Sequence, residues 1–310
     1  MVSVPCGRRL GLLLIFLLAT LPLAAQTLRA APTEEPEEPD YFFLTGGPYT
    51  QKKNSPQIIW AHQWYLSSRG GVRTRAYTGA GRFELGLTDR WEVDFEFGAL
   101  HARERLLGVT TFSQGGTADL LFGVRYRLLD ESFAPFTLTM GPQVVAPVAS
   151  RRRGLGTGKV GYAWDLAAAK EWAGPVFVAA SVNLGVTPGV PAFADGTGPE
   201  FDLSQVAGAV ARGFRPLERE TTFGASHDIH ILLEVGGSRA DEIEAGQRVR
   251  ATEVFFAPGL RYGFLGRGGS LTEIGVSFPL GLTGSSADWG FILQFQYELP
   301  SLFAKGGKTP

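Results

Sequence analysis

The tripeptide Ser226-His227-Asp228 contains the residue types of a hydrolytic triad, in which a base activates a hydroxyl and an acid orients the base. Successive residues of an extended strand point to opposite faces, so His227 cannot contact both neighbours there. The other histidines are His62, His101 and His230, and the only pair at metal-ligand spacing, His227 and His230, falls on opposite faces. We therefore expect no catalytic residues and no metal site.

Residues 156–161, GTGKVG, match the glycine spacing of a dinucleotide-binding loop. Such a loop must lie between a strand and the start of a helix, whereas a strand pattern follows here. A phosphate-binding loop is also excluded, because Val160 stands where a Ser or Thr must bind magnesium. The net charge of −1 provides no basic surface for nucleic acid. We expect no cofactor and no nucleic-acid partner.

Three consecutive arginines, Arg151-Arg152-Arg153, lie in a stretch without strand periodicity. Guanidinium groups bind phosphate with two parallel hydrogen bonds, so this stretch could contact lipopolysaccharide. The alternative is a solvent-exposed loop that binds nothing, and the sequence leaves both possibilities open.

Residues 78–102 hold the clearest structural pattern in the chain. Apolar residues alternate with acids, which places Trp91, Val93, Phe95, Phe97 and Ala99 on one strand face and Glu92, Asp94 and Glu96 on the other. A similar alternation precedes the turn Thr88-Asp89-Arg90. These residues predict a β-hairpin with one apolar, aromatic face and one charged face.

The same alternation recurs to the C-terminus in about twelve segments. Short connections mostly alternate with longer ones, which we place at 103–116, 148–158, 187–204 and 238–251. Outer-membrane barrels have short periplasmic turns, long outer loops, an apolar lipid face and a polar lumen. The sequence therefore predicts an all-β fold, a transmembrane antiparallel up-and-down β-barrel with both termini in the periplasm.

The ends of the chain differ from this pattern. Residues 1–25 combine Arg8-Arg9, a short apolar run and small residues, the features of a secretion signal. Residues 26–55 form an acidic, proline-rich periplasmic segment, 56–299 the barrel and 300–310 a tail. The only cysteine, Cys6, lies in the signal, so cysteine chemistry is excluded from the mature chain.

The turn sequence GLTDRWEV at 86–93 resembles the periplasmic hairpin of the outer-membrane barrel family of the phenol-degradation meta pathway, whose members are described as transporters. The resemblance implies a lipid-embedded barrel, uptake of small aromatic or hydrophobic compounds, and no catalytic residues. This chain departs from the usual barrel ending, because Tyr297 is followed by Glu298-Leu299 and the tail rather than by a terminal aromatic residue.

The inward-facing polar residues are the candidate functional set. We expect the lumen to be lined by Arg82, Glu84, Glu92, Asp94, Glu96, Asp119, Arg125, Arg127, His230, Glu234, Arg261, Glu273, Gln294, Gln296 and Glu298. Arg125 and Arg127 should pair with acids of the preceding strand. Such ion pairs could line a selective pore or simply fill a narrow barrel.

These observations predict an outer-membrane channel or transporter for small solutes that works by passive diffusion. Its expected partners are outer-membrane lipids and lipopolysaccharide, the barrel-assembly machinery and a small-molecule solute. A non-conducting structural barrel is the first alternative. An outer-membrane lipid hydrolase is the second, but it needs a serine, a histidine and an orienting group at one rim, which the sequence does not supply.

Overall fold

The computed structural model describes residues 42–172, 175–220, 226–265 and 270–299. The strands are β1 (Pro56–Arg69), β2 (Val72–Gly86), β3 (Trp91–Leu106), β4 (Val109–Thr117), β5 (Leu120–Leu129), β6 (Thr137–Ala146), β7 (Gly161–Glu171), β8 (Val176–Pro191), β9 (Glu200–Glu220), β10 (Ser226–Glu244), β11 (Gln247–Leu265), β12 (Leu271–Ser277), β13 (Leu280–Gly281) and β14 (Trp289–Glu298). They form one antiparallel sheet, in which most strands pair with their neighbours in chain order, while β4 pairs with β3 alone and β12 pairs with β14 rather than with β13.

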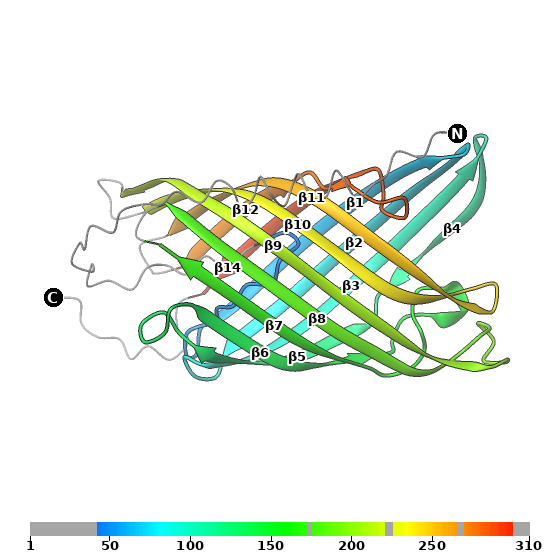
Figure 1. Cartoon of the computed structure of the whole chain (residues 1–310), viewed down its shortest axis with the longest axis horizontal. Helices are drawn as coiled ribbons and strands as arrows, with labels where there is room; N and C mark the ends of the chain where they lie inside the picture. Colours follow the sequence, from blue (N-terminus) through cyan, green and yellow to red (C-terminus); the bar gives the residue numbers. More distant parts are fainter. Residues whose placement is uncertain (1–41, 173–174, 221–225, 266–269, 300–310) are drawn as a thin grey trace.

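The sheet closes on itself because β1 pairs with β14 as well as with β2 (Figure 1). β4 and β5 pair with successive parts of β3, and β12 and β13 both lie between β11 and β14. The labelled strands therefore occupy twelve positions around the wall. The predicted up-and-down barrel of about twelve strands is confirmed.

The barrel is apolar outside and polar inside. Large outward side chains are exposed, including Phe122 at 48% and Leu184 at 50%, whereas the inward carboxylates of Glu92 and Glu234 are 0% exposed. The outward rings also pack across strands, with Phe95 and Phe122 centroids 4.9 Å apart. This inversion of an ordinary protein surface is the arrangement that a lipid bilayer stabilises.

The expected loops at 103–116 and 238–251 are wrong, because both regions are hairpins whose strands continue. β3 and β4 meet at Leu107-Gly108, with φ of 48° and 89°, and β10 and β11 meet at Ala245-Gly246, with φ of 49° and 81°. Two positive φ values mark the two-residue turn that suits antiparallel strands. These strand ends lie beyond the stretch of alternating apolar and polar residues, so their sequence lacks the pattern used to recognise strands.

The connections at 147–160 and 192–199 are irregular, and the first contains a short 3-10 helix (Arg151–Arg153). Arg151 donates to the carbonyl of Pro191, the last residue of β8, at 2.7 Å, and also to the carbonyl of Phe193, which joins these two connections. None of the described residues forms a helix that is long and apolar enough to cross a membrane.

Residues 42–55 enter the barrel at the rim near Lys52 and Lys53, which are exposed, and run inside it from Gln51 to Phe42; we call them the plug. Their buried aromatic side chains, Phe42, Phe43 and Tyr49, pack against inward residues of the wall, namely Ala169, Phe177, Ala179, Ala211, Leu232 and Ile292. The buried apolar cluster of this protein therefore lies within the lumen, around the plug. The remainder of the acidic segment expected at 26–55 lies outside the described residues.

Candidate functional site

The plug is bound to the wall through the carboxylate of Glu234, an inward residue of β10. The N–H of Phe43 donates to it at 2.7 Å, and those of Leu44 and Thr45 each donate at 2.8 Å. Glu234 is 0% exposed, so these donors replace the water that an ionised carboxylate needs. Hydrogen bonds to a charged group contribute about 1.5–3 kcal/mol each, so Glu234 contributes substantially to the attachment of the plug.

The ring of Phe43 lies in a space that two glycines of the wall leave open. A Cβ at Gly259 would lie 2.4 Å from this ring, and one at Gly275 would lie 2.8 Å from it. The guanidinium carbon of Arg261 is 5.4 Å from the ring centroid, and the same group meets Glu273 at 3.3 Å. Phe43 is thus held by shape and by a cation–π contact.

Arg125 of β5 links the wall to the middle of the plug. Its guanidinium lies 3.2 Å from Glu92, the residue directly opposite in register, and donates to the carbonyls of Tyr49 and Gly47. The second oxygen of Glu92 accepts from the N–H of Gln51 at 2.7 Å. A buried ion pair of two neighbouring strands therefore also binds the plug.

Arg127 contacts the part of the plug nearest the turns. It donates to the hydroxyl of Thr50 at 3.1 Å and to the Thr50 carbonyl at 3.0 Å, and it pairs with Asp130 at 2.8 Å. Asp130 lies in the turn after β5, where burial raises its pKa but hydrogen bonds from Ser132 and Arg127 outweigh burial and lower the pKa. Arg127 therefore joins the plug to this turn.

The residues proposed to line the lumen fall into two classes of burial. Ten are buried: Glu84, Glu92, Asp94, Arg125, Arg127, His230, Glu234, Arg261, Glu273 and Gln296. Five are half-buried: Arg82, Glu96, Asp119, Gln294 and Glu298. Arg82 meets Glu84 at 3.0 Å and Asp94 at 3.5 Å, so the acids of β2 and β3 share this cation. Gln294 accepts from Arg261 at 3.0 Å.

Asp119 has a different position from the rest of this set. Its carboxylate accepts from the N–H of Ala149 at 2.8 Å and so holds the connection between β6 and β7. His230 lies 2.5 Å from Asp228, and Arg215 donates to its ring at 3.0 Å. Neither residue is part of the Arg125 contacts with the plug.

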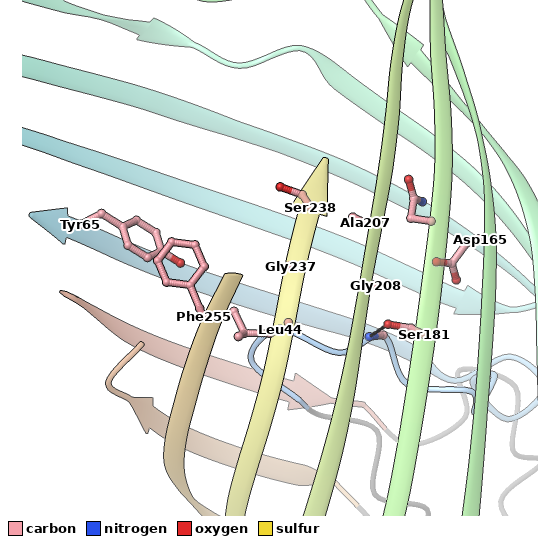
Figure 2. A pocket seen from close by; sticks show the side chains of 12 residues that line it. Leu44, Tyr65, Asp165, Ser181, Ala207, Gly208, Gly237, Ser238 and Phe255 are labelled. Carbon is pink, nitrogen blue, oxygen red and sulfur yellow. Dashed lines mark hydrogen bonds between the residues drawn. The ribbon is translucent and has the colours of Figure 1, made fainter. Parts of the chain in front are cut away.

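Two of the cavities in the lumen adjoin each other, and the smaller of the two borders the plug. One, of about 300 Å³, is bordered by Leu44 of the plug and by Asp165 of β7, and the other, of about 540 Å³, is bordered by Glu253. Tyr65 and Phe255 border both, with ring centroids 5.5 Å apart. Figure 2 shows these two rings across from Asp165 and Ser181. The aromatic pair therefore lies where the two cavities meet.

No motif in the sequence marks this cavity wall, since neither Tyr65 nor Phe255 belongs to one. The sequence could indicate only which face these residues share. Both aromatic residues occupy inward positions on strands whose outward residues are apolar.

Among the described side chains, His227 and Asp228 do not form the acid–base pair of a hydrolytic triad. The ring of His227 contacts the hydroxyl of Tyr262, an exposed residue of β11, whereas Asp228 turns inward to His230. Adjacent residues thus point to opposite faces, as the sequence predicted. Within the described parts of the chain, no three metal-binding side chains come together.

Replacing Arg125 by alanine is expected to loosen the plug and raise ion conductance in planar bilayers. Breaking a buried ion pair by removing one partner costs about 3–5 kcal/mol, part of which would come from the plug contacts. Arg82→Ala is the matched control, because its described ion pairs run to Glu84 and Asp94 of the wall. Equal conductance changes in the two variants would contradict a specific role of Arg125 in holding the plug.

Comparisons with known proteins identify the fold. No protein-family model matches the sequence, and no curated protein is significantly similar to it. The β-domain of the Bordetella autotransporter BrkA is similar over 80% of this chain and 100% of that one, with a TM-score of 0.52 and 13% identity. An outer membrane channel from Pseudomonas putida F1 is similar over 82% and 98%, with a TM-score of 0.53 and 14% identity. The chain thus has the fold of bacterial outer-membrane β-barrels.

Proposed function

We propose that this protein is an outer-membrane channel for small solutes, among them hydrophobic and aromatic compounds, and that its plug limits passive diffusion. The observation that carries the proposal is the pair of cavities that meet at Tyr65 and Phe255 beside a non-covalently held segment. The resemblance of residues 86–93 to the meta-pathway barrel family supports the same solute class. The similar channel from Pseudomonas putida F1 agrees with this proposal.

The dimensions and lining of the cavities suit small solutes with both apolar and polar parts. Binding pockets for small ligands typically have volumes of about 300–1,000 Å³. Tyr65 and Phe255 offer ring faces, and Asp165, Asn183 and Ser238 offer polar groups in the smaller cavity. A planar aromatic solute with a hydroxyl or amino group would satisfy both kinds of surface.

The orientation follows from the ends of the barrel. β1 begins and β14 ends at the same rim as the turn Leu87–Arg90, since Gln57 pairs with both Glu84 and Glu298. Short turns face the periplasm in outer-membrane barrels. We therefore place the plug entrance and both termini on the periplasmic side, with the larger cavity toward the outside.

A non-conducting structural barrel remains the second candidate. The observation that favours it is the extent of bonding between plug and wall, from Glu234 to Arg127. In this alternative the plug completes the core, and its removal would destabilise the barrel without opening a path.

A disulfide between the plug and the wall would separate the two candidates. A Cβ built at Gly46 lies 3.4 Å from the Cβ of Ser181, close to the separation of about 3.5–4.5 Å found in disulfides. The chain has only Cys6 of its own. In a Gly46→Cys/Ser181→Cys variant, we expect conductance in planar bilayers to fall on oxidation and to recover on reduction.

Deletion of residues 42–53 is the complementary measurement, with an expected rise in conductance as a constriction is removed. The oxidised double-cysteine protein provides the closed reference. If the deleted protein folds, as shown by heat-dependent gel mobility, but conducts no better than the oxidised one, the channel proposal is wrong and the structural barrel is favoured.

A further inference from the structure

Four arginines form a cluster on the outer surface of the β2–β3 hairpin. Arg73 lies opposite Arg105, and Arg75 lies opposite Arg103, in a register that runs uninterrupted along both strands. Phe95 is an even number of residues from Arg103 and Arg105, so the arginines share its outward face. The cluster therefore belongs to the surface that adjoins the membrane, not to the lumen.

The height of the cluster matches the outer rim of the apolar band. Arg103 follows Trp91 by twelve residues on β3, and Trp91 lies beside the turn at the other end. A rise of about 3.4 Å per residue and a tilt of about 40° place Arg103 about 30 Å above Trp91, against an apolar band about 25 Å tall. Tyr77 and His101, paired one step below the arginines, occupy the boundary.

The four positive charges have no compensating carboxylate among the described residues. No ion pair within 4.0 Å involves them there, and the only described side-chain partner is Thr110, to which Arg103 donates at 3.0 Å. The Nε atoms of Arg103 and Arg105 are buried without a hydrogen-bond partner. Like charges that face each other across a strand pair are destabilising, so a bound anion would stabilise this arrangement.

The outward arginines of the β10–β11 hairpin, on another part of the wall, have partners within the protein. Arg250 pairs with Asp241 at 2.8 Å, and Asp241 also accepts from Ser204. Arg248 donates to the carbonyl of Asp202 at 3.3 Å. The outward arginines of β11 are thus satisfied by the protein itself, whereas those of β2 and β3 are not.

The sequence left open whether Arg151-Arg152-Arg153 contacts phosphate or lies in a solvated loop, and two of these residues bind the protein. Arg151 donates to the carbonyl of Pro191, and Arg153 lies 3.5 Å from the carbonyl of Gly115. The tripeptide therefore joins the connections of the barrel rim, which leaves the β2–β3 cluster as the larger group of available cations.

We propose that Arg73, Arg75, Arg103 and Arg105 bind the phosphate groups of lipopolysaccharide in the outer leaflet. Guanidinium groups bind phosphate oxygens with paired, charge-assisted hydrogen bonds. The headgroup of a lipopolysaccharide molecule would lie at the level of the four arginines. Its acyl chains would lie along the apolar part of the barrel wall below them. The bound phosphates would neutralise the paired arginines and fix the β2–β3 hairpin against the membrane.

The test is lipid binding to the whole protein in detergent, measured by native mass spectrometry with bis-phosphorylated lipid A as the probe. We expect Arg73→Gln/Arg75→Gln/Arg103→Gln/Arg105→Gln to bind lipid A at least tenfold more weakly than the unchanged protein. Arg248→Gln/Arg250→Gln is the matched control, and its binding should be unchanged. Dephosphorylated lipid A should bind the unchanged protein as weakly as bis-phosphorylated lipid A binds the fourfold variant.

Three outcomes would overturn the proposal: unchanged binding by the fourfold variant, equal binding of dephosphorylated lipid A, or displacement of lipid A by an equimolar amount of inorganic phosphate. Heat-dependent gel mobility reports whether each variant is folded. Arg103→Gln alone, with an expected severalfold loss, replaces the fourfold variant if that protein does not fold.

Discussion

Replacing Glu234 by alanine is expected to release the plug and to give the largest rise in conductance of any single substitution. The change removes the acceptor of three backbone hydrogen bonds and leaves the N–H groups of Phe43, Leu44 and Thr45 without it. A loss of about 3–5 kcal/mol in plug binding corresponds to a more than hundredfold increase in the open population. Single-channel recording in planar bilayers measures this population as the fraction of time spent open.

Glu96→Ala is the matched control for Glu234→Ala. Glu96 is also an inward carboxylate, but it is half-buried and its electrostatic neighbours are Arg82 and Asp94 of the wall. Its removal should leave the open fraction near that of the unchanged protein. If Glu96→Ala and Glu234→Ala raise conductance equally, the effect comes from the charge of the lumen and not from release of the plug.

Phe95→Arg is expected to prevent assembly of most of the protein into the folded barrel. Phe95 lies four residues above Trp91 on the outward face, about 10 Å into an apolar band about 25 Å tall. Arginine near the middle of the bilayer costs about 2–4 kcal/mol in such barrels. The variant also loses the packing of Phe95 on Phe122, whose centroids are 4.9 Å apart. The folded fraction is measured by heat-dependent gel mobility after membrane extraction.

Asp94→Asn serves as the comparison for Phe95→Arg at the adjacent position. Asp94 faces inward, 3.5 Å from Arg82, and asparagine keeps an oxygen that can accept from that guanidinium. We expect a modest loss of stability and normal assembly. The assignment of lipid and lumen faces would be wrong if the two variants assembled equally poorly.

The barrel could be predicted from the sequence because every second residue of a spanning strand faces lipid and is apolar. Where the outward face meets acyl chains, as along Trp91 to Ala99, the contrast between faces is large and the strand is evident. Above this band the contrast disappears, and β3 continues to Leu106 without the pattern. Strand number was therefore predictable, while the length of the outer hairpins was not.

The plug was not predictable, because its contacts depend on residues far away in the chain. The bond from Phe43 to Glu234 joins positions 191 residues apart, and that from Thr50 to Arg127 joins positions 77 apart. The plug itself has no periodicity, so its sequence gives no indication of a partner. The alternation of side chains along the strand does place Glu234 inward. It does not distinguish a carboxylate that faces water from one that binds backbone N–H groups.

The two-residue turns also determine where proteases can cleave the outer rim. A protease needs an extended, locally unfolded segment, and it cuts most readily at exposed, flexible loop tips. Gly70-Gly71, Leu107-Gly108 and Ala245-Gly246 leave no such segment, because paired strands continue to the turn on either side. Proteolytic cleavage at this rim is therefore expected mainly in the irregular connections at 147–160, 192–199 and 282–288, where the chain leaves the sheet.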